Sequence, residues 1–167
     1  MSTPNPRILV WNARGLNSRA KRCVVYQVVV AANACIVCVQ ESKLQVVTPD
    51  IVRQCFGSEY NDFFYLPSQG TRGGIILAWK SEAVSLSHPH LSEHTLTARV
   101  NLQDRCWWLT GVYGPHRVAD KPAFLQKIRD VRDLHAGPWA IMGDFNLIVN
   151  PEDKSNCRIH RGLMGRY

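Results

Sequence analysis

The chain has 167 residues, a net charge of +7, 46% apolar residues and 20% charged residues. This length suits one domain with a real core, and the balance of apolar and charged residues excludes a disordered protein. No apolar stretch is long enough to span a bilayer, and the N-terminus lacks the pattern of a signal peptide. We therefore expect an intracellular protein. The excess of Lys and Arg favours polyanionic partners, with nucleic acid first and acidic membrane surfaces second.

The N-terminal part predicts a strand, a helix and a second strand. Residues 7–12 form an apolar run that is typical of a buried strand, and a turn follows it. Ser18 is a suitable N-cap for a helix that runs to about Ala32, although its many β-branched residues weaken helix propensity. Residues 34–40 then predict a second buried strand.

The middle of the chain predicts an antiparallel run of short strands. Turn-rich pieces separate apolar segments whose composition is typical of strands. The five predicted strands cover residues 62–66, 73–79, 83–87, 96–102 and 106–113.

The last predicted elements are an amphipathic helix and a buried strand. The helix covers residues 120–135, because its apolar residues recur at helical spacing, and Gly137-Pro138 ends it. Residues 139–142 form the strand, and the chain beyond Pro151 is polar and basic, without a clear core element. Strands that alternate with helices predict an α/β domain with a buried sheet and helices on both of its faces.

Cys35 and Cys38 form a C-x-x-C pattern, which raises the question of a zinc site. Both lie in an apolar segment that predicts a strand, where residues three apart point to opposite faces. No second C-x-x-C or paired histidines complete a zinc site. We interpret both residues as free buried thiols.

Polar side chains recur at the ends of the predicted strands. Each one directly follows an apolar run, where open α/β sheets place their ligand sites. If these strands are neighbours, the side chains converge on one edge. We call these residues the strand-end cluster: Asn12, Glu41, Tyr113, Asp144 and Asn146.

The chemistry of the strand-end cluster is compatible with metal-assisted hydrolysis of a phosphoester. Glu41 offers the carboxylate oxygens that Mg²⁺ or Mn²⁺ prefers, and Asp144 can orient or deprotonate an attacking water. Asn12 and Asn146 supply amide groups for a metal, a carboxylate or a phosphate, and Tyr113 can donate to a phosphate oxygen.

Each member of the cluster also has a purely structural interpretation. A single Asp or Asn after a strand is commonly a turn residue or a helix cap, so the hypothesis rests on the whole set. Trp107 and Trp108 are expected in the core rather than as a platform for stacked bases. His88 and His90, on either side of a proline, are expected in a solvated loop.

Five motifs in this order resemble the endonuclease/exonuclease/phosphatase superfamily, over residues 7 to 167. Among its branches, the chain is most similar to the N-terminal endonuclease domain of plant LINE-type (non-LTR) retrotransposon polyproteins. The segment 150–156 also resembles that branch. The motifs are Trp11-Asn12-Ala13-Arg14-Gly15-Leu16, Gln40-Glu41-Ser42-Lys43, Gly73-Gly74-Ile75-Ile76, Gly111-Val112-Tyr113-Gly114-Pro115 and Gly143-Asp144-Phe145-Asn146.

The resemblance implies a fold and a role for each member of the cluster. The fold is a four-layered α/β sandwich. Glu41 would bind Mg²⁺, with Mn²⁺ as the alternative, and Asn12 would hold the metal and active-site network. Tyr113 would contact the scissile phosphate, Asp144 would position or deprotonate the attacking water, and Asn146 would bind phosphate.

The retrotransposon branch also implies a substrate and a location. Its enzymes nick chromosomal DNA, and the freed 3′-hydroxyl primes reverse transcription. The partner would then be DNA in the nucleus, with no membrane and no obligate protein partner.

Two departures from the family pattern set further expectations. Arg14 stands where some relatives have an acidic residue, and the sequence contains no Ser-Asp-His motif, which ends the family's domain. We therefore expect a short tail at residues 1–6 and a domain at residues 7–167 that is incomplete at its C-terminal end, with weak or absent nicking.

Two alternatives remain open at the level of sequence. One is a phosphatase of the same superfamily that acts on inositol phosphates or lipid head groups. The other is a basic remnant that binds nucleic acid by charge alone, with steep salt dependence and little dependence on Mg²⁺.

Overall fold

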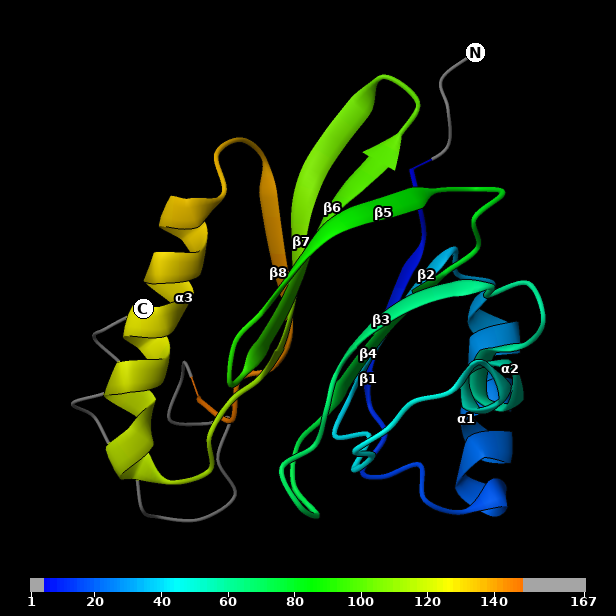
Figure 1. The fold of residues 1–167 in the computed structure, drawn as a ribbon, viewed down its shortest axis with the longest axis horizontal. Helices are drawn as coiled ribbons and strands as arrows, with labels where there is room; N and C mark the ends of the chain where they lie inside the picture. The colour runs from blue at the N-terminus through cyan, green and yellow to red at the C-terminus, as the bar shows by residue number, and fades with distance from the viewer. Residues whose placement is uncertain (1–4, 149–167) are drawn as a thin grey trace.

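The computed structural model describes residues 5–148 and contains two four-stranded sheets (Figure 1). In the first sheet the strand order is β1-β2-β4-β3. Strands β1 and β2 are parallel, and the other neighbours are antiparallel. The strands are β1 (Ile8–Asn12), β2 (Ile36–Gln40), β3 (Asp62–Leu66) and β4 (Ile75–Trp79).

The second sheet has the order β5-β6-β7-β8 and packs against the first. Here β7 and β8 are parallel, and the other pairs are antiparallel. Each sheet therefore has one parallel pair, joined in each case through a helix, as parallel strands require. The strands are β5 (Ser85–Leu91), β6 (Thr95–Leu102), β7 (Arg105–Tyr113) and β8 (Trp139–Asp144).

Helices cover the outer face of each sheet, so the molecule has four layers (Figure 1). The helices α1 (Arg19–Ala32) and α2 (Pro49–Phe56) pack on the first sheet. A short 3-10 helix, η1 (Val118–Asp120), leads into α3 (Lys121–Leu134), which packs on the second sheet. The four-layered α/β sandwich implied by the family resemblance is confirmed.

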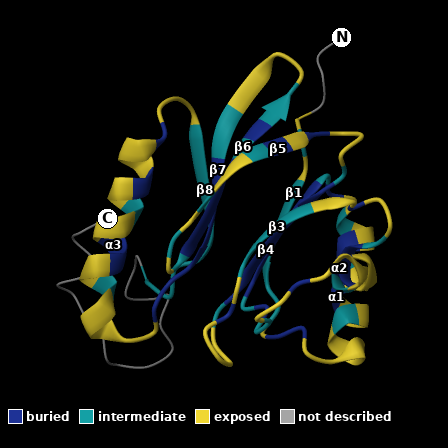
Figure 2. Ribbon diagram, in the orientation of Figure 1, coloured by how far each residue is buried: buried dark blue, intermediate teal, exposed yellow. Residues whose placement is uncertain are grey.

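Most of the buried residues lie in the sheets and on the inner faces of the helices (Figure 2). The alternation within β2 explains this arrangement. Val37 and Val39 belong to the core beneath α1 and α2, whereas Ile36 and Cys38 belong to the core between the sheets. Strands covered on both faces are apolar throughout, which is why β2 reads as a continuous apolar run.

Several sequence-based expectations are corrected by the structure. The chain has two facing sheets rather than a single sheet with helices on both faces, and the predicted antiparallel run is divided between them. Helix α2 was not expected. His88 and His90 lie within β5, next to a register shift, and not in a loop. Antiparallel edge strands interrupted by a bulge lose the alternation that identifies a strand from sequence.

Other expectations are confirmed or lie outside the described residues. Ser18 accepts a hydrogen bond from the backbone N of Lys21 and caps α1, as predicted. Within residues 5–148, no helix has both the length and the apolar character needed to cross a membrane. The predictions for the polar segment after Pro151, and for residues 1–4, fall outside the described residues.

Cys35 and Cys38 are free thiols, as the sequence predicts, but only Cys38 is fully buried, and the two side chains do not point to opposite faces. Cys35 lies just before β2 and packs against the same core as Cys38. No group of three or more His, Cys, Asp or Glu in the described part of the chain is arranged to hold a metal ion. Burial raises the pKa of both Cys38 and Cys55 to about 12, so both stay protonated at neutral pH.

We predict selective alkylation of the thiols in the folded protein. Cys23 and Cys106 are exposed and should react with iodoacetamide at about pH 8, whereas the buried, protonated Cys38 and Cys55 should stay unmodified. Peptide mass spectrometry gives the modified fraction at each site, and labelling in denaturant is the control. Native labelling of Cys38 at the rate of Cys23 would contradict the described core.

Gly111 lets the two sheets approach closely. A Cβ atom added at this position would lie 2.5 Å from Sγ of Cys38 and 3.4 Å from Cγ2 of Ile75. Real side chains do not tolerate the first of these distances, so only a residue without a side chain fits here.

We predict that Gly111→Ala destabilises the fold by about 1–3 kcal/mol, because the added methyl overpacks the core between the sheets. Chemical denaturation measures the loss. Cys38→Ala in the same chain removes the Sγ atom and should restore part of the stability, which a double-mutant cycle quantifies. Purely additive effects would show that this contact does not limit the spacing of the sheets.

Candidate active site

The carboxyl ends of four strands lie at one end of the sandwich. The register pairs Asn12 with Gln40 at the end of β1 and β2, and Tyr113 with Asp144 at the end of β7 and β8. A hydrogen bond of 2.8 Å from Nδ2 of Asn12 to Oδ2 of Asp144 joins the two sheets. Glu41, directly after β2, acts on the pKa of Tyr113 through its charge and a hydrogen bond. The structure therefore brings together polar residues that are far apart in sequence.

The Asp144 carboxylate is held at both oxygens. Oδ2 accepts from Asn12, and Oδ1 accepts from the backbone N of Asn146 at 2.9 Å. Gly143, just before it, has a φ of 141°, and a Cβ atom there would lie 2.1 Å from the carbonyl oxygen of Val112. The backbone can present Asp144 in this way only because residue 143 has no side chain.

Asn12 is fixed at both ends of its amide. While Nδ2 donates to Asp144, Oδ1 accepts from the backbone N of Arg14 at 3.0 Å. This second contact uses the backbone of Arg14, so it does not depend on the residue type at position 14. The Arg14 side chain is exposed.

Tyr113 is 8% exposed, and its pKa is raised to about 12. Burial is the main cause, and the negative charges of Glu41 and Asp144 add to it. The hydroxyl also lies 2.8 Å from Nε2 of His116. Tyr113 therefore remains protonated at neutral pH and can act as a hydrogen-bond donor.

Glu41 forms an ion pair with Lys43, with 3.2 Å between Oε1 and Nζ. The Glu41 side chain is 17% exposed, so the carboxylate is accessible but not fully solvated. Lys43 supplies positive charge at the place where a cation would otherwise balance this carboxylate.

Asn146 anchors the loop after β8. Its Nδ2 donates to the carbonyl oxygen of Gly114 at 2.7 Å, and its own carbonyl oxygen accepts from Nζ of Lys121 at 2.6 Å. The side-chain amide thus ties the end of β8 to the segment after β7. A role in binding phosphate stays a prediction.

The backbone is locally strained around this cluster. Seven described residues other than glycine have a positive φ, and four of them follow strand ends at this site. Such residues cost free energy and persist only where the surroundings hold them, which is common at functional sites. The four are Arg14, Glu41, Lys43 and Asn146.

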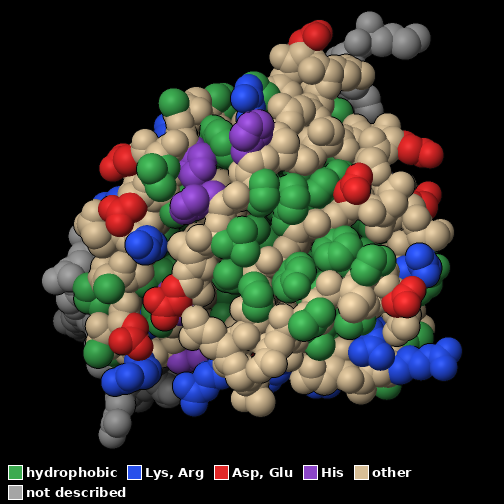
Figure 3. Space-filling model, viewed as in Figure 1, with side chains coloured by type: hydrophobic (Ala, Val, Ile, Leu, Met, Phe, Trp, Pro, Cys, Tyr) green, Lys and Arg blue, Asp and Glu red, His purple; other side chains and the backbone are tan. Residues whose placement is uncertain are grey.

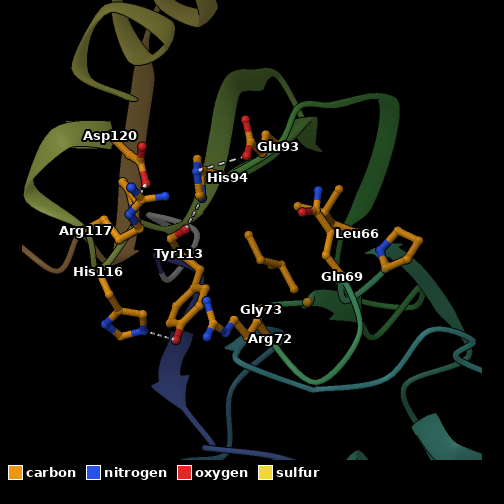
Figure 4. A pocket seen from close by; sticks show the side chains of 15 residues that line it. Leu66, Gln69, Arg72, Gly73, Glu93, His94, Tyr113, His116, Arg117 and Asp120 are labelled. Carbon is orange, nitrogen blue, oxygen red and sulfur yellow. Dashed lines mark hydrogen bonds and ion pairs between the residues drawn. The ribbon is translucent and has the colours of Figure 1, made fainter. Parts of the chain in front are cut away.

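Sequence reasoning missed several residues next to the cluster. His116 contacts the Tyr113 hydroxyl, and Nδ1 of His94 lies 2.9 Å from the Tyr113 carbonyl oxygen. Arg72 lies beside Tyr113 (Figure 4). Its position three residues after Tyr113 could have pointed to His116. The sequence holds no such signal for Arg72 and His94, because they lie in the β3–β4 and β5–β6 connections.

The chain belongs to the Endonuclease/Exonuclease/phosphatase family, whose model matches residues 9–166. No curated protein matches the chain in sequence.

Solved structures with a similar fold include the following three. An AP endonuclease from Leishmania major has a TM-score of 0.66 and 16% identity over 93% of this chain and 60% of that one. The catalytic domain of Xenopus laevis APE2 has a TM-score of 0.63 and 19% identity, over 91% and 62%. D. rerio TDP2, complexed with a single-strand DNA product, has a TM-score of 0.62 and 19% identity, over 84% and 60%. The chain thus spans about three fifths of the length of these structures.

We predict that Tyr113 ionises only near pH 12, which is well above the ordinary tyrosine value. A spectrophotometric titration of the native protein minus that of Tyr113→Phe isolates this group, and Tyr26→Phe, at an exposed tyrosine, is the control. The pKa of Tyr113 is higher in the folded than in the unfolded protein, so protonated Tyr113 contributes to the stability of the fold. This contribution is complete below about pH 10 and is lost as the pH rises towards 12. Ionisation of Tyr113 near pH 10 would show that the group is not shielded.

Proposed function

We propose that this domain is a metal-dependent endonuclease that cleaves phosphodiester bonds of DNA. The observation that carries the proposal is the Asp144 carboxylate, which Asn12 and the backbone of Asn146 hold at both oxygens. Glu41 and the protonated hydroxyl of Tyr113 lie beside it. A fixed carboxylate beside a hydrogen-bond donor is the arrangement needed to direct water at a phosphate. The net charge of +7 favours a polyanionic substrate.

Mg²⁺ fits the donors of the cluster, with Mn²⁺ as the alternative. Glu41 offers a partly exposed carboxylate, and Oδ1 of Asn12 is a hard oxygen donor at the same strand ends. Mg²⁺ keeps several waters and needs only one or two carboxylates together with substrate phosphate, so a small ligand set suffices. When bound, this ion would neutralise the phosphate and polarise it as a Lewis acid.

The protein's own residues divide the remaining tasks. Asp144 orients the attacking water and accepts its proton, while Asn12 keeps the carboxylate in place. Tyr113 donates to a non-bridging phosphate oxygen, and its pKa of about 12 keeps that proton available at neutral pH. Asn146 binds the phosphate through its side-chain amide, and its backbone N holds the Asp144 carboxylate.

We further propose that the domain belongs to a LINE-type retrotransposon protein and nicks nuclear DNA to prime reverse transcription. Support comes from the resemblance of the five motifs taken together to that branch, and from the segment 150–156, which lies outside the described residues. The names of the similar structures, an AP endonuclease and TDP2 with a DNA product, are compatible with a DNA substrate.

We predict slow, Mg²⁺-dependent nicking of supercoiled plasmid by an excess of the protein. Glu41→Gln and Asp144→Asn should each lower the rate by about a hundredfold or more, because they remove the metal ligand and the base. Gel electrophoresis measures the nicked fraction. If the nick has a free 3′-hydroxyl, a DNA polymerase extends it directly.

The matched controls are Glu82→Gln and Asp104→Asn, which neutralise carboxylates in turns at the opposite end of the sandwich. Both should keep the rate of the unmodified protein. Nicking that survives both cluster variants, or no Mg²⁺-dependent nicking at all, contradicts the proposal. Turnover of an inositol polyphosphate but not of plasmid would favour a phosphatase. Binding with steep salt dependence but no Mg²⁺ effect would favour the non-catalytic alternative.

A further inference from the structure

A cavity of about 170 Å³ opens beside Tyr113, between the β3–β4 hairpin and the segment after β7 (Figure 4). Tyr113 is the one member of the strand-end cluster that lines this cavity within the described residues. The cavity therefore adjoins the proposed catalytic site but is distinct from it.

The cavity has apolar walls and a polar edge. Leu66 and Pro67 contribute apolar surface from the hairpin, and Tyr113 and Pro115 contribute it from the opposite side. The polar and charged residues around it are Gln69, Arg72, Glu93, His94, His116, Arg117 and Asp120. Apolar walls with hydrogen-bonding groups at the edge suit a flat heterocycle.

The size of the cavity supports a single aromatic ring. An apolar cavity of about 150 Å³ accommodates benzene, so 170 Å³ suffices for a one-ring base, and a two-ring base would protrude towards solvent. Apolar side chains also gather at the surface between β3 and β5, the edge strands on the same side of the molecule (Figure 3).

The cavity is flanked by arginines that suit a phosphate backbone. Within residues 5–148, the exposed Arg72 side chain has no hydrogen-bond or salt-bridge partner. Arg117 is 78% exposed, and its ion pair with Asp120 is long, at 3.9 Å. Both guanidinium groups are therefore available for phosphates on either side of a bound base.

Backbone hydrogen bonds fix both walls relative to the catalytic cluster. The backbone N of Lys43 donates to the carbonyl oxygen of Gly73 at 2.9 Å, which ties the hairpin to the segment of Glu41. On the other wall, the backbone N of Tyr113 donates to the carbonyl oxygen of His94 at 3.0 Å. A ligand in the cavity thus has a defined position relative to both Glu41 and Tyr113.

We propose that this cavity binds one unpaired nucleobase of the DNA strand whose phosphate lies at Tyr113, an inference that rests on the proposed endonuclease function. The base lies between the apolar side chains of the hairpin and those of Tyr113 and Pro115. Arg72 and Arg117 contact the neighbouring phosphates. The substrate class is thereby narrowed to DNA with an unpaired nucleotide next to the cleaved bond.

Fluorescence anisotropy in EDTA tests this proposal without cleavage. The probes are a short labelled thymidine oligonucleotide and an abasic oligonucleotide of equal length, which has the same phosphates but no bases. We expect about tenfold tighter binding of the thymidine strand. Leu66→Trp fills the cavity and should bring this ratio close to one. Arg72→Ala should weaken both strands and lower the salt slope by about one.

The control is Arg53→Ala, which removes an exposed arginine from α2, outside the cavity, and should change neither ratio nor slope. Circular dichroism checks that Leu66→Trp is folded. If it is not, Gln69→Ala, which removes a hydrogen-bonding side chain from the polar edge of the cavity, should lower the ratio by about threefold or more.

Equal binding of the two strands by the unmodified protein, or a ratio that none of the cavity variants changes, overturns the proposal. Displacement of the thymidine strand by an equal concentration of an inositol polyphosphate also overturns it. The binding assay contains no metal, so a negative result there does not affect the prediction that nicking depends on Glu41 and Asp144. A negative result in the nicking assay likewise does not prevent measurement of the preference for the thymidine strand.

Discussion

The close approach of the two sheets at Gly111 is the constraint on which the site depends. With no side chain on β7 at this position, Sγ of Cys38 occupies the space that a Cβ atom would need. This packing holds β7 and its neighbour β8 at a fixed spacing from β1 and β2. The hydrogen bond between Asn12 and Asp144 spans that spacing at 2.8 Å, within the narrow range where such a bond is strong. The geometry of the strand-end cluster is therefore a consequence of how the two sheets pack against each other.

Local strain at the strand ends is the cost of this geometry. A left-handed conformation costs about 1–2 kcal/mol for a residue with a side chain, and Glu41 and Asn146 both adopt it. Specific contacts offset the cost. The backbone N of Ser42 donates to the carbonyl oxygen of Gly74, and the Asn146 side chain donates to that of Gly114. The cluster is thus held in position by the protein before any substrate binds.

Tyr113 connects the proposed catalytic site with the adjacent cavity. Its hydroxyl lies near Glu41 and His116. Its side chain also lines the cavity, on the wall opposite Leu66. The two proposals assign the parts of one nucleotide to neighbouring groups: the phosphate to Tyr113 and Asp144, and the base to the cavity. Under these proposals, the hydrogen bonds that tie both walls to the cluster would link recognition of the base to positioning of the phosphate.

The sequence alone specified most of the elements and the polar residues that follow the strands, because periodicity and strand-end position are local properties. It did not reveal α2 or the strand character of His88 and His90, where an irregular edge strand hides the alternation. Only the tertiary structure assigned the strands to two facing sheets and brought His94 and Arg72 to Tyr113. The physical reason is that an apolar pattern shows that a face is buried, but it does not show which surface covers it.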